Sequence, residues 1–297
     1  MSAGPGSPVL DQLAQAAEQG RICALAADGQ RDLRRTAERY PQLFPAPPFD
    51  PALFGSVALA ISFGAPECEA EHLRLTNRTV LWGFAVDWLV DHEATSRAEI
   101  DSLADACLAV ADGAPPAADQ PLARLLAEIR DELVTSPGYL PHAPVWRDQV
   151  RTVFAAMARE WDWRRSGHRP SLDDYLRNAA NLACTVVNVT HWIRSGDPET
   201  LAHLGELVTV SDQVQQVLRL VNDFGTYQRD RRWGDLNALD LVADRAEVEQ
   251  RLDVLQATAR RSIDGLSVSC PEPADYLARQ IGFSSGFYRL ADYWGDL

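Results

Sequence analysis

The chain has 297 residues, of which 46% are hydrophobic and 24% charged, a balance that is typical of a folded globular protein and excludes disorder over most of its length. Its 42 acidic residues outnumber the 28 basic ones, which are all arginine, and the net charge is −14. This balance offers no basic surface that could hold a phosphate backbone, so we expect no nucleic-acid partner.

The beginning of the chain does not resemble a targeting signal. Residues 1–20 carry acidic residues early and lack an apolar core after a basic start, so they are not a signal peptide, and we expect them to be flexible. No run of about 18 apolar residues occurs, which predicts no stable membrane anchor. The five cysteines include no CxxC pair and indicate neither a disulfide framework nor a zinc site. Together these features predict a cytoplasmic protein.

Segments with helical spacing of apolar residues follow one another along the chain. Val150, Val153, Phe154 and Met157 form one such series, and residues 204–221 contain another. Runs of β-branched residues with hairpin turns are missing. Breaks rich in proline and glycine separate the segments, at 41–51, 112–121, 136–144, 166–170, 196–198 and 269–273. The sequence therefore predicts an all-α protein of about ten helices that folds as a single domain over residues 1–297.

Two aspartates stand out in the apolar stretch from Trp82 to Val90 and just after it. Asp87 and Asp91 are four residues apart, so on an α-helix they would lie one turn apart on the same face. Asp87 has apolar neighbours on both sides, where an unpaired carboxylate would cost several kcal/mol. Two carboxylates at this spacing repel each other unless a cation lies between them, which makes the pair a candidate metal site.

A helix is expected to begin after Ser171, because a serine followed by acidic residues is a typical helix beginning. The stretch from Ser171 to Asp174 comes close to DxDD, the general-acid motif of class II terpene cyclases, but it lacks the first carboxylate. A helix cap is therefore a sufficient interpretation.

Asn222, Thr226 and Asp230 form the second candidate site. They follow one another at intervals of four residues, so each lies only about 40° further around a helix and their side chains form one stripe. An amide, a hydroxyl and a carboxylate are hard oxygen ligands that suit Mg²⁺, which shares its other positions with water and phosphate oxygens. Arg229, beside the last of them, could bind the same phosphate.

These two segments resemble the metal-binding motifs of class I terpene synthases. Residues 222–230 match the family's second motif, (N/D)Dxx(S/T)xxxE, except that Asp230 replaces the glutamate. Residues 84–91 resemble the first, aspartate-rich motif, although Trp88 stands where the second aspartate is usual. Prenyl chain-elongating enzymes share the fold but carry two aspartate-rich motifs, which argues against them. The resemblance covers most of the chain and implies a bacterial-type α domain.

The resemblance also implies arginines that bind the substrate diphosphate. Arg229 is one candidate. The family's diphosphate-sensing arginine lies in a YLxxR stretch, which here reads Tyr175-Leu176-Arg177-Asn178-Ala179. Because Ala179 occupies the expected position, we take Arg177 as the candidate sensor. Arg289 is the nearest match to the arginine of the family's C-terminal Arg-Tyr pair.

The implied fold is the class I terpenoid synthase fold, a helical bundle around an apolar cavity. The implied cofactor is Mg²⁺, or Mn²⁺ in its place, as three ions held by Asp87, Asp91, Asn222, Thr226 and Asp230. Asp87, Arg229 and Arg177 are expected to act in ionisation of the substrate, and the loop 231–237 is expected to close over the diphosphate. Aromatic side chains would stabilise the carbocation and, together with Arg289, would form the substrate site: Trp82, Phe84, Trp88, Trp192, Phe224, Tyr227 and Tyr288.

The substrate is less clearly indicated. Trp88 in the first motif, the string DWLVD at residues 87–91 and the incomplete YLxxR stretch resemble bacterial class I diterpene synthases. This resemblance favours a C20 substrate, copalyl-type or geranylgeranyl diphosphate, that is cyclised or quenched to a diterpene with release of diphosphate. One alternative is a sesquiterpene synthase that uses farnesyl diphosphate. An alternative of another class is a non-catalytic helical protein that binds a prenyl diphosphate or a lipid. The sequence leaves these open, together with whether the chain forms a homodimer.

Overall fold

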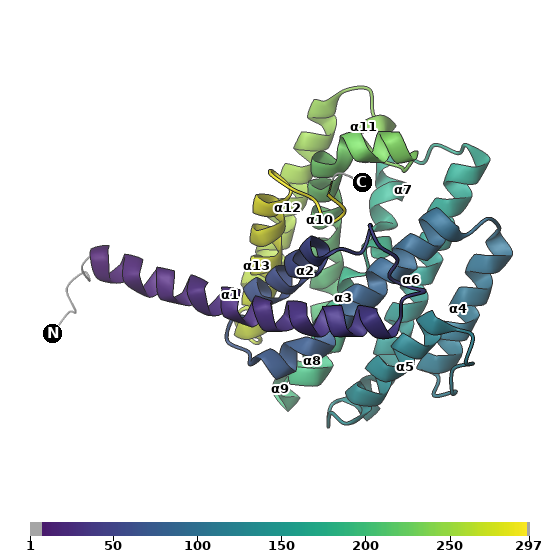
Figure 1. The fold of residues 1–297 in the computed structure, drawn as a ribbon. Helices are drawn as coiled ribbons and strands as arrows, with labels where there is room; N and C mark the ends of the chain where they lie inside the picture. The colour runs from purple at the N-terminus through teal and green to yellow at the C-terminus, as the bar shows by residue number, and fades with distance from the viewer. Residues whose placement is uncertain (1–7, 296–297) are drawn as a thin grey trace.

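The computed structural model describes residues 8–295, which form helices joined by loops and contain no β-strand (Figure 1). In this range the α-helices are α1 (Pro8–Arg39), α2 (Pro51–Gly64), α3 (Ala70–Trp88), α4 (Arg97–Ala111), α5 (Pro121–Val134), α6 (Tyr139–Ser166), α7 (Leu172–Arg177), α8 (Cys184–Ser195), α9 (Pro198–Ala202), α10 (Leu204–Trp233), α11 (Ala238–Leu241), α12 (Arg245–Leu266) and α13 (Pro271–Phe287). A π-helical turn, η1 (Leu89–Glu93), continues α3, and a 3₁₀ turn, η2 (Ala179–Leu182), joins α7 to α8. The all-α prediction is confirmed, with several short helices beyond the ten expected.

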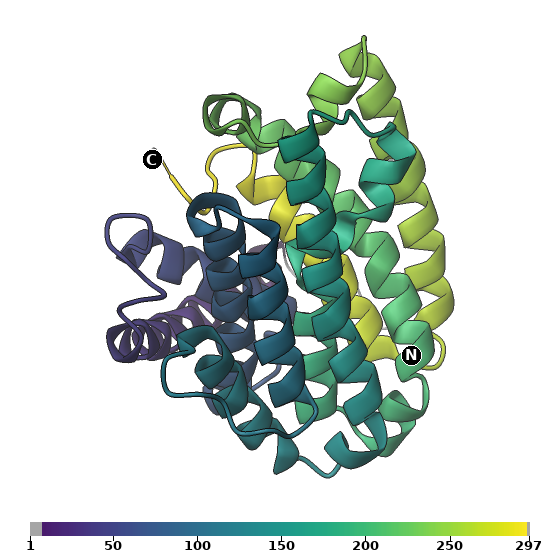
Figure 2. The ribbon, with the colours of Figure 1, turned by 90° about the vertical axis from the view of Figure 1, so that its right-hand side faces the viewer.

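Five helices form a closed ring at the centre of the molecule. Helix α2 packs against α3, α3 against α8, α8 against α10, α10 against α13, and α13 packs against α2 again. Helix α6 packs on α8, and α12 packs on α10 and α13. Figure 2 shows the longer helices running side by side. The predicted helical bundle is thus confirmed, and its ring of helices leaves an enclosed interior.

Capping residues place the beginnings of several helices. The Asp50 side chain accepts a hydrogen bond from Leu53 N at 2.8 Å at the start of α2, where Pro51 occupies the first turn. Ser171 Oγ accepts from Asp174 N at 3.1 Å, so α7 begins where the sequence predicts. Such caps stabilise a helix by about 1 kcal/mol each.

A continuous apolar core holds the helices together. Val150, Val153, Phe154 and Met157 are at most 3% exposed, as their helical spacing predicts. On α10 the apolar series continues through Val217, which is fully buried. Burying a side chain of this size contributes about 1.5–3 kcal/mol, so packing of these faces, more than helix propensity, keeps the ring closed.

The N-terminal expectation concerns residues 1–20. Residues 8–20 belong to α1, whose first turns extend beyond the bundle (Figure 1). The side chains of residues 11–20 are exposed. Residues 1–7 lie outside the described part of the chain.

One predicted break is a helix instead. We expected residues 136–144 to interrupt the helical pattern, but α6 begins at Tyr139 and contains Pro144 in its second turn. A proline near a helix beginning removes only one backbone hydrogen bond, to the carbonyl four residues before it. That carbonyl belongs to Leu140, which is 79% exposed, so water can satisfy it.

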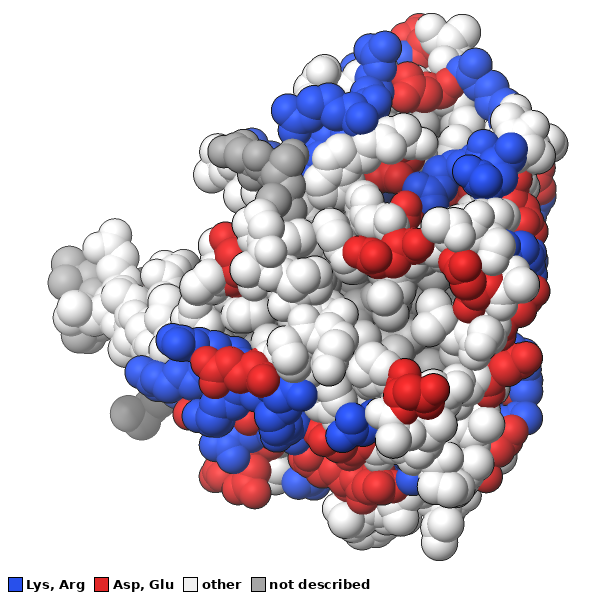
Figure 3. Space-filling view, turned by 45° about the vertical axis from the view of Figure 1, so that its right-hand side comes forward, with Lys and Arg blue, Asp and Glu red and all other residues white. Residues whose placement is uncertain are grey.

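The molecular surface carries mixed charge. On the face in Figure 3 arginines gather in separate groups, each with acidic residues beside it, and uncharged atoms fill the area between them. That face therefore presents no continuous basic surface. None of the helices between residues 8 and 295 combines the length and the apolar character that crossing a bilayer requires.

Candidate active site

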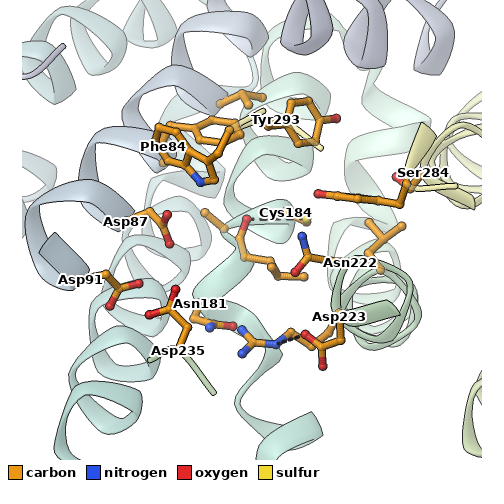
Figure 4. Close-up of a pocket in the computed structure, with 18 of the residues that line it drawn as sticks. Phe84, Asp87, Asp91, Asn181, Cys184, Asn222, Asp223, Asp235, Ser284 and Tyr293 are labelled. Carbon is orange, nitrogen blue, oxygen red and sulfur yellow. Dashed lines mark hydrogen bonds and ion pairs between the residues drawn. The ribbon is translucent and has the colours of Figure 1, made fainter. Parts of the chain in front are cut away.

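Asp87 and Asp91 lie where α3 widens into a π-helical turn. Over Leu89–Glu93 the backbone hydrogen bonds reach five residues back, as Ala94 N to Leu89 O does at 2.8 Å. A π turn holds more residues than an α turn, so simple α-helical spacing does not describe how the two aspartates are related. Both carboxylates nevertheless face the cavity from the same wall (Figure 4).

An arginine from another helix pairs with one of these aspartates. Arg164, near the end of α6, donates to Asp91 through Nη2 and to Asp235 Oδ1 through Nη1, the latter at 2.6 Å. All three side chains are at most 21% exposed. Because Asp235 follows α10, Arg164 connects the two sides of the cavity mouth. Sequence reasoning missed Arg164 and its contact with Asp235, since more than 70 residues separate Arg164 from either aspartate.

Asp87, in contrast, has no hydrogen-bond or ion-pair partner within residues 8–295. Burial and the neighbouring charge of Asp235 raise its pKa and Arg229 opposes the rise, which together bring the pKa to about 7. Burial and the neighbouring Asp87 also raise the pKa of Asp91, against the charge of Arg164. A half-buried carboxylate without a partner is costly, and a bound cation would remove that cost.

Asn222, Thr226 and Asp230 lie on successive turns of α10, as their spacing predicts. Thr226 Oγ1 donates to Asp230 Oδ2 at 2.7 Å, and Asn237 Nδ2 donates to the same oxygen at 2.8 Å. Asn222 and Asp230 line the cavity, whereas Thr226 is 1% exposed and is not part of the lining. The stripe therefore presents an amide and a carboxylate to the cavity, and the threonine hydroxyl supports the carboxylate from behind.

Arg229 connects α10 to the C-terminal segment, residues 288–295. Its Nη2 lies 3.1 Å from Asp230 Oδ1 and its Nη1 lies 3.0 Å from Asp292 Oδ1. Its guanidinium carbon lies 5.0 Å from the ring centre of Trp233, where a cation–π contact holds it in place. Arg229 also lines the cavity, so it is positioned to bind an anion there.

Asp223 anchors a buried polar network that sequence reasoning missed. It is 1% exposed and accepts hydrogen bonds from the Tyr175 hydroxyl and from Ala238 N, each at 3.0 Å. Arg219 Nε donates to the Tyr175 hydroxyl at 2.6 Å, and Arg219 Nη2 donates to Glu160 at 3.0 Å. Burial raises the pKa of Asp223 to about 7, against the charge of Arg219. This network fixes α6, α7 and α10 relative to one another.

The cavity lies between these walls and measures about 240 Å³. In Figure 4, Asp87 and Asp91 lie on one side and Asn222 and Asp223 on the other. Away from this polar end the wall is mainly apolar and includes Ile61, Val80, Val187, Leu218 and Phe283. An apolar cavity with carboxylates at one end can hold a hydrocarbon chain with a charged head.

The predicted aromatic residues are divided by the structure. Phe84 and Tyr288 line the cavity, together with Trp294 and with Tyr293, which sequence reasoning did not select. Trp294 packs on Phe84 at 5.3 Å between ring centres. The other selected aromatic residues lie elsewhere: Trp82 and Trp192 are buried in the core, Trp88 packs on Phe49 and Trp294, Phe224 packs beneath Arg245, and Tyr227 donates to Asp240. Helical periodicity marks a residue as buried but does not tell a cavity wall from solid core.

Two predicted arginines do not reach the cavity. Arg177 is 65% exposed and pairs with Asp174 one turn before it, and Arg289 is exposed. Neither is among the cavity-lining residues. The assignment of Arg177 as diphosphate sensor is corrected accordingly, because α7 ends at this residue and turns its side chain to solvent. The arginines that line the cavity are Arg219 and Arg229, and Arg164 lies at its carboxylates.

The segment after α10 is partly helical. Of the loop 231–237, residues up to Trp233 continue α10, and Gly234 ends the helix in the left-handed conformation with φ of 79°. Asp235 and Leu236 then line the cavity. Its closure over a ligand stays a prediction.

The oxygen atoms at the polar end suit Mg²⁺. Asp87 offers a carboxylate that has no partner within residues 8–295, and Asn222 and Asp230 on α10 offer two further oxygens to the cavity. Within residues 8–295 no three His, Cys, Asp or Glu side chains are grouped closely enough to hold an ion on their own. Magnesium sites in proteins usually combine one or two carboxylates with water and substrate phosphate oxygens, and this donor set fits that mode.

Comparison with known families decides the identity of this fold and site. The family model described as terpene synthase family 2, C-terminal metal binding, matches residues 78–260. The chain belongs to the terpene synthase family. The matched range contains both walls of the polar end, from Asp87 to Asp235, so the carboxylates described above lie in the metal-binding domain of a class I terpene synthase.

Individual relatives agree with this assignment. The terpene synthase described here is 30% identical over 277 residues to an ent-pimara-9(11),15-diene synthase of Streptomyces sp. (strain KO-3988), an alignment that covers 89% of this chain and 91% of the relative. The family and this relative are enzymes, so the alternative of a non-catalytic binding protein is set aside.

Solved structures share the fold. 2-Methylisoborneol synthase from Streptomyces coelicolor A3(2), in complex with Mg²⁺ and geranyl-S-thiolodiphosphate, superposes with a TM-score of 0.71 at 18% identity, over 92% of this chain and 93% of that one. Linalool/nerolidol synthase from Streptomyces clavuligerus, in complex with 2-fluorogeranyl diphosphate, superposes with a TM-score of 0.70 at 16% identity, over 87% of this chain and 93% of that one. These likenesses confirm the class I terpenoid synthase fold.

Proposed function

We propose that this terpene synthase converts a C20 diphosphate, copalyl-type or geranylgeranyl, into a diterpene and diphosphate. The observation that carries this proposal is the full-length similarity to an ent-pimaradiene synthase, a diterpene synthase, at 30% identity. The cavity is of the expected kind, because its carboxylate-lined end can bind a diphosphate head through Mg²⁺ and its apolar remainder can hold a hydrocarbon chain.

The polar end would hold three Mg²⁺ ions. Asp87 and Asp91 would be the ligands on one wall, and Asn222, Thr226 and Asp230, on successive turns of α10, would be those on the other. When bound, the ions supply Lewis acidity that neutralises the diphosphate as it leaves. Thr226 can bind a metal ion only when its hydrogen bond to Asp230 breaks. Asp91 can bind one only when its ion pair with Arg164 breaks.

Arginine side chains of this chain would bind the diphosphate directly. Arg229 lines the cavity and is held between Asp230 and Asp292, so its guanidinium needs only to exchange a carboxylate for a phosphate oxygen. Arg164 can make the same exchange when Asp91 binds metal. Both exchanges keep every charge paired, which makes binding of the anion favourable at this end.

The rest of the cavity would protect the carbocation from water. Phe84, Tyr288 and Tyr293 present aromatic rings to it, and aromatic faces attract cations. Trp294 packs on Phe84 and covers the same region from the C-terminal segment. An apolar, closed site of this kind excludes the water that would quench the cation early.

One observation favours a second candidate, a sesquiterpene synthase that uses farnesyl diphosphate. The cavity of about 240 Å³ lies below the range of about 300–1,000 Å³ that is usual for sites of drug-sized ligands. A C15 chain fits such a volume with less rearrangement of the walls than a C20 chain does.

A substrate panel separates the two. The purified protein is incubated with Mg²⁺ and with geranyl, farnesyl, geranylgeranyl, copalyl or ent-copalyl diphosphate, and the products are identified by gas chromatography and mass spectrometry. The proposal expects a cyclised diterpene from a C20 substrate at the highest turnover. Turnover that is highest with farnesyl diphosphate would replace it with the second candidate.

A further inference from the structure

The floor of the cavity carries a polar side chain that the ionisation chemistry does not use. Gln280 on α13 lines the cavity beside the apolar Val187 and Leu218. Tyr288, eight residues further along the chain and just after the end of α13, packs against Gly225, level with the metal-binding stripe. At about 1.5 Å per residue, Gln280 therefore lies about 12 Å deeper than Tyr288, where the hydrocarbon end of a substrate would lie.

The amide of Gln280 is held in a reciprocal pair. Gln280 Nε2 donates to Asn188 Oδ1 at 2.7 Å, and Asn188 Nδ2 donates to Gln280 Oε1 at 3.1 Å. Asn188 on α8 is fully buried and is not part of the cavity lining. Two hydrogen bonds between the same pair of amides restrict rotation of both, so the Gln280 dipole has a fixed place in the cavity wall.

A chain of hydrogen bonds, which starts at the exposed Asp212 and is buried from Thr185 inward, fixes which way this pair points. Asp212 is a carboxylate and can only accept, so the Thr185 hydroxyl donates to it at 2.7 Å. The Thr185 oxygen then accepts from the Ser211 hydroxyl at 3.2 Å, and Ser211 in turn accepts from Asn188 Nδ2 at 2.8 Å. Each hydroxyl has one hydrogen, so the amide nitrogen of Asn188 must face Ser211, and its oxygen must accept from Gln280.

We propose that Gln280 is a specificity-determining residue of this synthase. Its amide, held in one orientation, is the dipole that determines which carbon of the hydrocarbon skeleton carries the positive charge before the cation is deprotonated or captured by a nucleophile. The negative end of the dipole, Oε1, accepts one hydrogen bond from Asn188, and an amide oxygen has two lone pairs, so it can take part in a second interaction. In an apolar wall this oxygen stabilises a nearby cation strongly, because little else screens it. Asn188 is the positioning residue. The proposal rests on the carbocation chemistry of the family and not on the length of the substrate.

Three variants test this proposal. Gln280→Met removes the dipole and keeps the length of the side chain. Asn188→Leu leaves the cavity lining unchanged but releases the Gln280 amide. Gln215→Met is the matched control, because Gln215 is 2% exposed, accepts a hydrogen bond from Thr185 N at 3.3 Å, and is not part of the cavity lining.

The readouts are the rate of diphosphate release and the composition of the products from one substrate that the parent converts. We expect Gln280→Met and Asn188→Leu to release diphosphate within about threefold of the parent rate, while the ratio of the main product to the others changes in the same direction by about twofold to tenfold. Gln215→Met should keep the product ratio of the parent. Circular dichroism confirms that each variant is folded.

Two results would overturn the proposal. Product ratios equal to the parent's in a folded, active Gln280→Met would show that the amide only joins α8 to α13. A changed ratio in Gln280→Met with an unchanged one in Asn188→Leu would show that cavity shape, and not the held dipole, is responsible. A parent that releases no diphosphate from any prenyl substrate would instead contradict the proposed function, so the two failures are distinguishable.

Discussion

Replacing Asp87 by asparagine should make the metal-free protein more stable while it removes activity. The carboxylate has no partner within residues 8–295, and burial raises its pKa from 3.8 to about 7. A folded-state pKa above the unfolded value means that ionisation of Asp87 destabilises the fold, so the parent loses stability as the pH rises from about 4 to about 7. A shift of about three units corresponds to at most about 4 kcal/mol. We expect about half of this, because Asp87 is part-exposed and shares its field with Asp91.

Thermal melts in EDTA measure this difference. For a chain of 297 residues, about 2 kcal/mol corresponds to about 3 °C. Asp87→Asn should therefore melt about 3 °C above the parent at pH 8 and together with it near pH 4, where both carry a neutral side chain. Diphosphate release with Mg²⁺ should fall at least about 100-fold. A variant that melts below the parent at both pH values would contradict this prediction, because it would make Asp87 a structural hydrogen-bonding residue.

Further predictions concern the other wall of the cavity and its surroundings. Asn222→Ala should lower turnover at least about 100-fold with a melting temperature within about 2 °C of the parent. Asp223→Ala should instead lower the melting temperature by about 3–6 °C, because it leaves two buried donors unpaired. Thermal melts and product assays on both variants separate the two roles. Arg177→Ala should keep the parent's turnover, and a large loss would return this exposed residue to the site. Gly225→Ala should lower the free energy of unfolding by about 1–3 kcal/mol, because its Cβ would lie 2.7 Å from Tyr288 O. A melting temperature equal to the parent's would contradict that close approach.

The features that could be predicted from the sequence are those set by local periodicity. Asn222, Thr226 and Asp230 fall on one stripe because α10 is a regular helix over Leu204–Trp233, so spacing alone orders their side chains. Asp87 was recognisable because a carboxylate among apolar residues needs a special reason, and the structure leaves it unpaired within residues 8–295.

The features that could not be predicted depend on contacts between distant parts of the chain. Arg164 contacts Asp91 and Asp235 because the end of α6 lies beside both aspartates in the folded chain. No local pattern in the sequence around Arg164 indicates these contacts. The π turn at Asp91 leaves no mark in the spacing of its neighbours. Arg177 was selected from a motif whose register differs here by two residues, and the end of α7 places it in solvent.

Binding of Mn²⁺ in the presence of inorganic diphosphate tests most directly the claim that two facing walls act as one site. Titrations of the parent, Asp87→Asn and Asn222→Ala, followed by calorimetry or electron paramagnetic resonance, compare the two walls without depending on the identity of the prenyl chain. We expect Mn²⁺ binding that requires diphosphate in the parent and is weakened at least about tenfold in each variant. Parent-like binding in either variant would contradict it, because the wall that carries that residue would then lie outside the metal site.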